Sequence, residues 1–505
     1  MAAWSGSVIR SSPSTAVHER SGPASVPPPI LLEAGGLPGS DDREPSWVRS
    51  AAVPSRAESR SAPREEQVPR YVERFACIGP ACTDSCCKAW DLRLDRATYE
   101  RYQLIPVESL LGQKVRQSVV EMPEPRSERQ YGRILLNEAL DCAFLSRERW
   151  CEIQLEMGEE ALSPTCRTYP RIEQRTPSGR EETTLHLSCP EAARLILLEE
   201  DAQREQPAAE DYAAVAQRCA SGMVAAQEGE LPERVLGATR EFLLLLLRDR
   251  RYSLGERMLM TGLYAGRLPA ALGLRAAPGL RAAPVLDERE AGQRFAALVR
   301  EFCVRVGEGM LLPALGRVPG QPAMQLALTL GVVNRRLDRV MNSMGFLDGV
   351  KQFLDGIGYR PGMTPAALAP ALVRAEQAWF GPWVEASPWV LENYLVHAMY
   401  RSLFPVGRDW IEADPEAIFR ELSTHFVAIR TLLTGMAGGA DFGSEHAVRM
   451  VQAYSRMVDH HAEFLQVAAG LMKTVGWADE GSMAGLLLEG AGSRLRGGGD
   501  RRAMA

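Results

Sequence analysis

The chain has 505 residues, of which 46% are hydrophobic and 24% charged, and its formal net charge is −6 at pH 7. This length is sufficient for two or three domains with a large core. The mildly acidic balance gives no reason to expect nucleic acid as a partner, and no apolar run approaches the roughly 18 residues that a membrane span needs. We therefore expect a protein that binds neither nucleic acid nor membranes.

Residues 1–68 are rich in Ser, Pro and Arg and poor in apolar side chains. Such a segment cannot bury enough surface to offset the entropy lost on ordering, so we predict a disordered tail here and a second one at 491–505. The first twenty residues contain no apolar core of the kind found in secretory signals, which predicts a cytoplasmic protein.

Residues 69–205 are the next predicted unit, in which short segments alternate with turn residues. The stretch "RATYERY" after Asp95 predicts a short helix, because an aspartate is a good N-cap. An amphipathic pattern at 145–162 predicts a longer helix, and "TTLHLSC" predicts a strand that ends at Cys189. The unit has little continuous apolar periodicity, so we expect a bound metal to stabilise it.

Most of the ten cysteines are concentrated in this unit. Cys219 and Cys303 lie farther along the chain on apolar helix faces and are predicted core residues. A secreted disulfide scaffold would need an export signal and is normally much shorter, so the cluster indicates metal binding. The candidate metal ligands are Cys77, Cys82, Cys86, Cys87, Cys142, Cys151, Cys166 and Cys189.

The spacing of these cysteines favours an iron–sulfur centre over zinc, although zinc stays open. Structural zinc sites usually contain paired CxxC motifs, and the sequence contains none. Cys86 and Cys87 are adjacent, and neighbouring side chains of extended backbone point in opposite directions, so the two fit poorly as ligands of one ion. An iron–sulfur cluster tolerates thiolates from scattered positions better.

From residue 206 to 490, apolar residues recur at three- and four-residue spacing, which predicts an all-helical domain. The clearest predicted helices lie at 234–250, 291–310, 325–344 and 417–436, and the Pro- and Gly-containing stretch 267–284 predicts a loop. The predicted fold is therefore mainly α, with a small irregular cysteine-rich module before a larger helical domain.

The cysteine motifs carry a resemblance to a known family. The stretches "FACIGPACTDSCCKAW", "LDCAFLSRERWCEIQ", "CRTYPR" and "SCPEAARL" follow in this order. Their order and spacing resemble the flagellin lysine-N-methylase family, and the cysteine part also resembles a wider group of zinc- or iron-chelating proteins. The likeness continues more weakly through 242–268, 392–405 and 450–460.

This resemblance implies an enzyme that transfers methyl groups from S-adenosylmethionine to lysines of flagellin, its expected protein partner. It also implies an iron–sulfur centre, most simply a 4Fe–4S cluster, on the cysteine motif. The sequence contains no glycine-rich nucleotide-binding loop, so the residues that bind S-adenosylmethionine stay unknown. The ligands whose context both families share are Cys82, Cys86, Cys142, Cys151 and Cys166, followed by Cys77, Cys87 and Cys189.

Glu392 and Tyr394 are candidates to orient or deprotonate the substrate amine, although a helix N-terminal Glu and a packed Tyr are the favoured explanation. Trp90 is expected to shield a cluster from water. Arg167, Tyr169 and Arg171 follow Cys166 in "CRTYPR". They are expected to surround an anionic, thiolate-rich centre. Two other functions stay open: a non-catalytic iron–sulfur or zinc protein, such as a redox sensor, and a metal-stapled helical interaction scaffold.

Overall fold

The structure is a computed structural model, and it describes residues 69–123, 127–200, 202, 211–274, 287–315, 317–337, 344–407, 413–458 and 480–490. Helices make up most of these residues, and the few strands are short, so the predicted mainly α fold is confirmed. The tails predicted at 1–68 and 491–505 lie outside the described residues.

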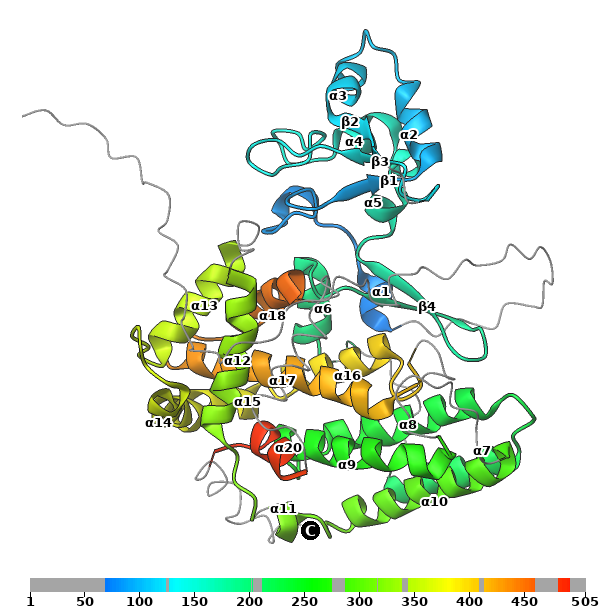
Figure 1. Cartoon of the computed structure of the whole chain (residues 1–505), viewed down its shortest axis with the longest axis vertical. Helices are drawn as coiled ribbons and strands as arrows, with labels where there is room; N and C mark the ends of the chain where they lie inside the picture. Colours follow the sequence, from blue (N-terminus) through cyan, green and yellow to red (C-terminus); the bar gives the residue numbers. More distant parts are fainter. Residues whose placement is uncertain are drawn as a thin grey trace, which may run out of the picture.

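Residues 75–168, which we call the cysteine module, form a small unit at one end of the longest axis of the molecule (Figure 1). Its three strands pair antiparallel in the order β1–β3–β2, and Leu94, Tyr102, Phe144 and Ile153 fill a core of its own. In chain order its elements are η2 (Gly79–Ala81), β1 (Leu92–Leu94), α2 (Arg96–Gln103), α3 (Leu110–Ser118), β2 (Val119–Glu121), β3 (Gly132–Ile134), α4 (Glu152–Met157), η3 (Glu159–Ala161) and α5 (Pro164–Thr168).

Two sequence predictions for this module had different outcomes. The helix predicted after Asp95 is confirmed as α2, and the Asp95 carboxylate accepts a hydrogen bond of 2.9 Å from the Thr98 backbone N–H. The long helix predicted at 145–162 is wrong. Its first residues form a turn that is closed by an isolated β-bridge between Leu145 and Cys151. The short α4 then ends at Gly158, which has a φ of 84°.

The segment between the module and the helical body packs with the body. Tyr71 of α1, Leu185 of β5 and Ile196 of α6 belong to the large core. The strand predicted to end at Cys189 stops at Leu185, because Pro170, which would pair next with His186, has no N–H to donate. The predicted division at 205/206 stays a prediction. The elements are α1 (Arg70–Arg74), β4 (Arg171–Arg175), β5 (Glu181–Leu185) and α6 (Pro190–Leu198).

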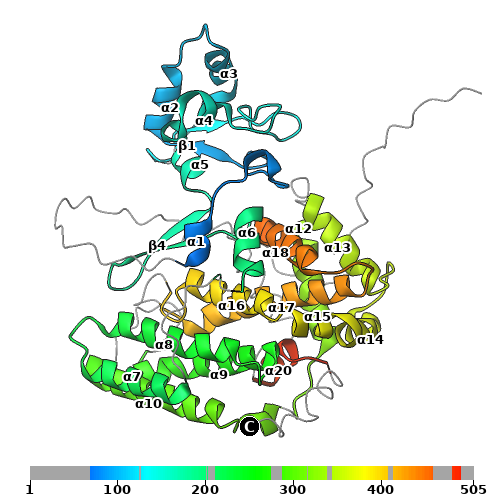
Figure 2. The same cartoon turned by 180° about the vertical axis from the view of Figure 1, so that it is seen from behind.

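The helical body contains the remaining helices, and α17 runs through its middle (Figures 1 and 2). The four helices predicted most clearly are confirmed within their described residues as α8, α10, α12 and α17. In chain order the elements are α7 (Tyr212–Val224), α8 (Leu231–Arg248), α9 (Leu254–Leu272), α10 (Glu288–Gly307), α11 (Leu312–Leu315), α12 (Pro322–Leu337), α13 (Met344–Gly356), α14 (Pro365–Ala375), η5 (Glu376–Phe380), α15 (Gly381–Ala386), α16 (Trp389–Ser402), α17 (Pro415–Ala437), α18 (Ser444–Val458) and α20 (Glu480–Leu487).

The loop predicted at 267–284 begins later than expected. Leu268 and Leu272 are buried, so α9 continues to Leu272 despite Pro269 and ends at Gly273 in the left-handed conformation. Residues 275–284 of that prediction lie outside the described part.

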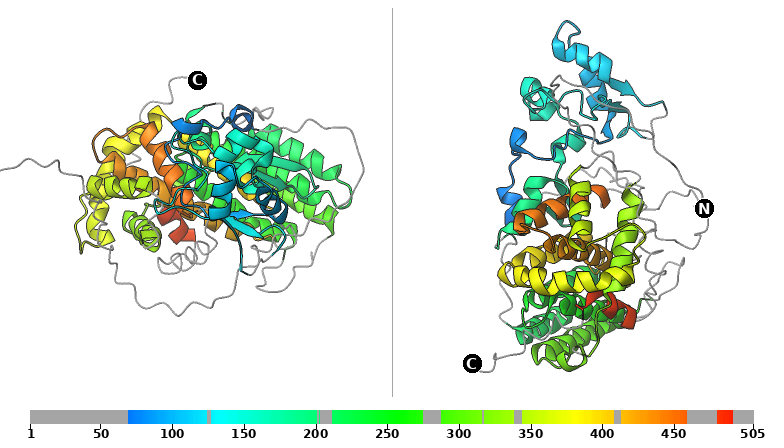
Figure 3. Two further views of the ribbon diagram at one scale, coloured as in Figure 1. Left: turned by 90° about the horizontal axis from the view of Figure 1, so that it is seen from above. Right: turned by 90° about the vertical axis from the view of Figure 1, so that its left-hand side faces the viewer.

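α13 and α17 pack so closely that a Cβ added at Gly356 would lie only 1.9 Å from the Gly435 carbonyl oxygen. Figure 3 shows the cysteine module above one end of this helical body. Within the described ranges, none of the helices combines the length and the hydropathy that crossing a membrane requires.

Candidate metal centre

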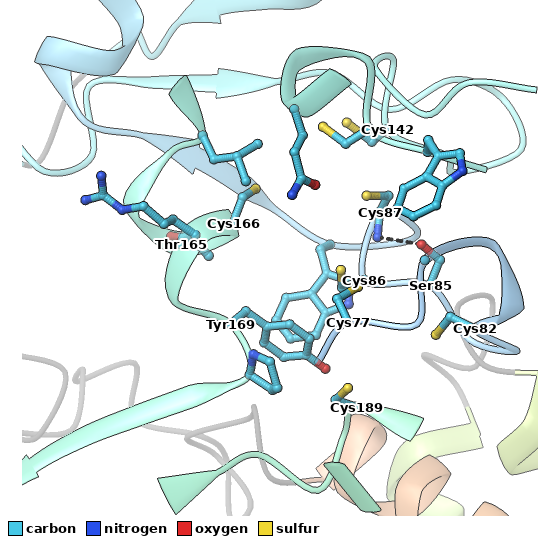
Figure 4. Close-up of a pocket in the computed structure, with 18 of the residues that line it drawn as sticks. Cys77, Cys82, Ser85, Cys86, Cys87, Cys142, Thr165, Cys166, Tyr169 and Cys189 are labelled. Carbon is cyan, nitrogen blue, oxygen red and sulfur yellow. Dashed lines mark hydrogen bonds between the residues drawn. The ribbon is translucent and has the colours of Figure 1, made fainter. Parts of the chain in front are cut away.

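All eight cysteines predicted as metal ligands line one pocket of about 400 Å³ (Figure 4). The pocket lies where the module meets α6, and the ten cysteines of the chain are free thiols. Cys219 and Cys303 are buried in the helical core, as predicted, and do not line this pocket. The structure therefore brings together the whole predicted ligand set and leaves out both cysteines predicted as core residues.

Short local elements position these thiols. Cys82 caps the end of η2, Cys151 and Cys189 precede the first turns of α4 and α6, and Cys166 lies within α5. Cys142 is tied to the loop before β1, because its N–H donates to the Cys87 carbonyl over 2.7 Å. Most of the thiols thus sit at the ends of short helices or beside isolated bridges, where single side chains can be aimed inward.

The loops around the pocket adopt backbone conformations that are unusual for their residues. Ala89 and Arg149 have φ values of 59° and 64°, in the left-handed region that residues other than glycine rarely adopt. Gly79 has a φ of 52°, and a Cβ there would lie 2.5 Å from the Trp150 ring. The Arg149 guanidinium also donates to the Cys82 carbonyl over 2.7 Å. Such outliers gather at functional sites, where the surrounding structure holds them in place.

Two side chains of α18 hold residues 84–88, which we call the cysteine loop, against the helical body. Arg456, 7% exposed, donates to the Lys88 carbonyl over 2.6 Å and to the Ser85 carbonyl over 3.3 Å, and pairs with the Asp84 carboxylate at 3.1 Å. Gln452 donates to the Asp84 carboxylate over 2.9 Å and to the Ser188 carbonyl over 2.8 Å. The position of Cys86 and Cys87 therefore depends on a helix 368 residues farther along the chain.

Sequence reasoning missed the role of Arg456, Gln452 and Asp84. The first two stand in "MVQAYSRMVDH", a stretch that carried only a weak resemblance, and nothing local distinguishes Arg456 from other helical arginines. Both residues are buried on α18 among apolar neighbours. A polar residue within such an apolar pattern is the signal that could have identified them.

Burial favours the protonated form of the Cys142 and Cys166 thiols. Burial raises the pKa of Cys142 to about 12 and that of Cys166 to about 11, and neighbouring thiols add to both shifts. A metal replaces these protons, since thiolates are the ligands. Across the described segments, no three His, Cys, Asp or Glu side chains converge as the ligands of one ion. Eight thiols that line one pocket are a donor set of the kind that zinc or an iron–sulfur cluster uses.

The pocket also contains aromatic and charged side chains. Trp90 packs edge-on against Tyr169 with ring centroids 5.1 Å apart, and the Arg456 guanidinium lies 5.7 Å from the Trp90 ring. The Tyr169 hydroxyl lies 3.0 Å from the Ser188 hydroxyl, and burial raises its pKa. Trp90, Arg167, Tyr169 and Arg171 all line the pocket, so the residues expected to surround a metal centre are next to the thiols.

The two candidate catalytic residues lie elsewhere. Glu392 and Tyr394 are buried on α16 and are not among the residues that line the cysteine pocket. The Glu392 carboxylate accepts hydrogen bonds from Arg250 over 2.9 and 3.0 Å and from Arg257 over 2.8 Å. A carboxylate held by two guanidinium groups has a structural role that explains its burial on α16, so the catalytic assignment stays a prediction.

The helical body matches a known family. Residues 240–486 match the FliB lysine N-methylase C-terminal domain. The flagellar biosynthetic protein FliU of Salmonella muenchen is 34% identical over 135 residues, which are 26% of this chain and 78% of that relative. The chain belongs to the FliB family of lysine N-methylases. The family resemblance seen in the cysteine motifs is thereby confirmed.

Two further relatives of this family are longer. The lysine-N-methylases of Salmonella typhimurium and Salmonella choleraesuis are 35% and 34% identical to the chain over 135 residues. These residues are 26% of this chain, and the match spans only about a third (33%) of the length of each relative. No solved structure matches the chain.

Proposed function

We propose that this chain is a protein-lysine N-methyltransferase that uses S-adenosylmethionine, acts on flagellin and holds an iron–sulfur centre in its cysteine pocket. The observation that carries the proposal is the pocket itself, in which eight thiols meet aromatic and charged side chains in a member of the lysine N-methylase family. The flagellar name of one relative supports a flagellar substrate.

The eight pocket cysteines are the residues that would hold the iron–sulfur centre, which supplies redox or Lewis-acid chemistry when bound. The remaining pocket residues can hold the reactants. Trp90 and Trp150 offer aromatic faces to a sulfonium cation, and Arg149 and Arg171 can pair with a carboxylate. We place the methyl donor here because the described strands form only small antiparallel sheets, unlike the parallel sheets that usually bind such nucleotides.

The target lysine must lose its proton before it can react, since its reference pKa is about 10.4. Apolar walls disfavour the charged amine, and Glu159 lines the pocket as an acceptor for the proton. The neutral amine then uses its lone pair to form the nitrogen–carbon bond while the methyl–sulfur bond breaks, which leaves S-adenosylhomocysteine. Positioning of the amine in line with that bond supplies much of the rate.

The full-length, metal-loaded protein should transfer label from methyl-labelled S-adenosylmethionine to lysine side chains of flagellin from its own organism. Transfer should rise with pH as the target amine loses its proton. It should be abolished by Cys142→Ser and kept by Cys303→Ser, a matched control in the helical core. If the loaded protein neither binds S-adenosylmethionine nor labels flagellin, the enzyme proposal fails and a non-catalytic metal protein takes its place.

The metal assignment has a separate readout. Protein purified without oxygen should be brown and contain iron and acid-labile sulfide in roughly equal amounts, as iron–sulfur clusters do. Metal analysis and visible absorption spectra of the full chain measure this. A colourless protein with stoichiometric zinc would contradict the iron–sulfur proposal.

A further inference from the structure

Two of the apolar side chains that line the cysteine pocket are exposed. Ile78 is 37% exposed and Trp150 is 41% exposed, whereas Phe144 and Ile153, which also line the pocket, are 1% and 2% exposed. The exposed pair therefore marks the mouth of the pocket, where it meets the solvent. Large apolar side chains exposed beside a pocket are typical of a surface that contacts a partner.

Two loops hold Trp150 in this exposed position. Gly79, with a φ of 52°, lies so close to the indole that a Cβ there would be 2.5 Å from the ring. The Trp150 N–H donates to the Ser146 hydroxyl over 3.1 Å, and the Trp150 carbonyl accepts from the Ser146 N–H over 2.8 Å. The preceding residue, Arg149, has a φ of 64°. Residues in such sparsely populated conformations concentrate at ligand-binding sites, so this turn favours a binding role for Trp150.

Half of the charged side chains that line the pocket already have an ion-pair partner. The pairs are Asp84–Arg456 at 3.1 Å, Glu191–Arg194 at 2.7 Å and Arg167–Glu160 at 3.6 Å. For the other three lining residues, Arg149, Arg171 and Glu159, no ion pair is found within the described part of the chain. Two cations and one carboxylate are therefore left for ligands.

Arg149 is the cation at the mouth. It is exposed next to Trp150, and its guanidinium donates to the Cys82 carbonyl over 2.7 Å. A guanidinium has five N–H donors, so one bond to a carbonyl fixes the group and leaves donors for a ligand. Arg171 lies instead at the start of β4, with its guanidinium 5.2 Å from the centre of the Phe75 ring. The mouth thus combines an apolar surface with a fixed positive charge.

We propose that Trp150 and Arg149 determine specificity by binding an extended segment of the protein substrate that has an acidic residue next to the target lysine. Trp150 packs against the segment, and Arg149 pairs with the acidic side chain, since charge-assisted bonds to a carboxylate are strong. Arg149 repels a segment with basic neighbours. The inference rests on the proposed function for the target lysine and adds the class of sequence around it.

The test measures peptide binding to the full-length, metal-loaded protein. Two fluorescently labelled peptides each carry one central lysine and differ only in the residues that flank it, which are Glu in one and Arg in the other. By fluorescence anisotropy at low salt, the wild type should bind the Glu peptide about three- to tenfold more tightly, as expected for an exposed charge pair. The difference should shrink as the salt concentration rises.

Variants of the mouth separate its two contributions. Arg149→Gln should abolish the preference, Arg149→Glu should reverse it, and Arg149→Lys should keep part of it. Arg147→Gln is the matched control, because Arg147 is exposed in the same turn but does not line the pocket, and it should keep the full preference. Trp150→Ala should weaken the binding of both peptides about tenfold and leave their ratio unchanged.

Far-ultraviolet circular dichroism checks the fold of each variant, and the wild type decides even without them. Equal binding of the two peptides by the wild type would overturn the proposal. A folded Arg149→Gln variant that keeps the preference would overturn it too, as would one that loses affinity for S-adenosylmethionine instead, since Arg149 would then bind the carboxylate of the methyl donor. The readout does not depend on catalysis. Methyl transfer without a peptide preference rejects only this inference, whereas a preference without methyl transfer rejects only the proposed function.

Discussion

Replacing Arg456 with alanine should release the cysteine loop and destabilise the protein by about 2–3 kcal/mol, the usual cost of removing a hydrogen bond from a charged group and leaving its acceptors unpaired. The Arg456 side chain is 6% exposed, and its loss leaves the carbonyls of Ser85 and Lys88 without this donor and Asp84 with the hydrogen bond from Gln452 alone. Denaturant unfolding of the full chain measures the change. Iron content should fall with it, because the loop carries Cys86 and Cys87.

Arg449→Ala is the matched control, since Arg449 lies exposed on the same helix. It should change the free energy of unfolding by no more than about 0.5 kcal/mol. Arg456→Lys should rescue little, because one ammonium cannot reproduce the planar fork that contacts two carbonyls and a carboxylate. Unchanged stability and iron content in Arg456→Ala would show that α18 does not hold the loop.

Local rules predicted much of the fold. Asp95 marks the start of α2 through its own side chain, and the apolar spacing that includes Phe242 and Leu246 defines α8. The same rules failed at 145–162, where apolar side chains at helical spacing belong partly to a turn. There the N–H of Ser146 donates to the Trp150 carbonyl over 2.8 Å, and only the part after Cys151 is helical. Periodicity reports which residues face a core, not which backbone brings them there.

The candidate site was predictable in composition but not in arrangement. Cysteine spacing identified all eight lining thiols, because thiols clustered outside an export context indicate metal. Which thiols lie near one another depends on tertiary pairing, such as the hydrogen bond from the Cys142 N–H to the Cys87 carbonyl. The hydrogen bond between Arg456 and Lys88 of the cysteine loop joins residues that are 368 positions apart in the chain. No local sequence pattern encodes such a contact.

Replacing Glu392 with alanine should cost about 3–5 kcal/mol of folding free energy, because it leaves a buried cation without its partner. The side chains of Glu392 and Arg257 are each 5% exposed and their charged atoms lie 2.8 Å apart. The hydrogen bond to Glu392 also raises the pKa of Arg250, which binds the other side of the carboxylate. Thermal and denaturant unfolding of the full chain measure the loss.

Glu290→Ala is the matched control, since Glu290 forms an exposed pair with Arg294 on α10 and should contribute less than about 1 kcal/mol. The double variant Glu392→Leu/Arg257→Met should regain part of the lost stability, because it removes both buried charges together. If Glu392 acts only through this ion pair, the folded fraction of Glu392→Gln should keep its methyl transfer rate. Full stability of Glu392→Ala combined with lost methyl transfer would instead restore Glu392 as a catalytic residue, and it would move the reaction centre from the cysteine pocket towards α16.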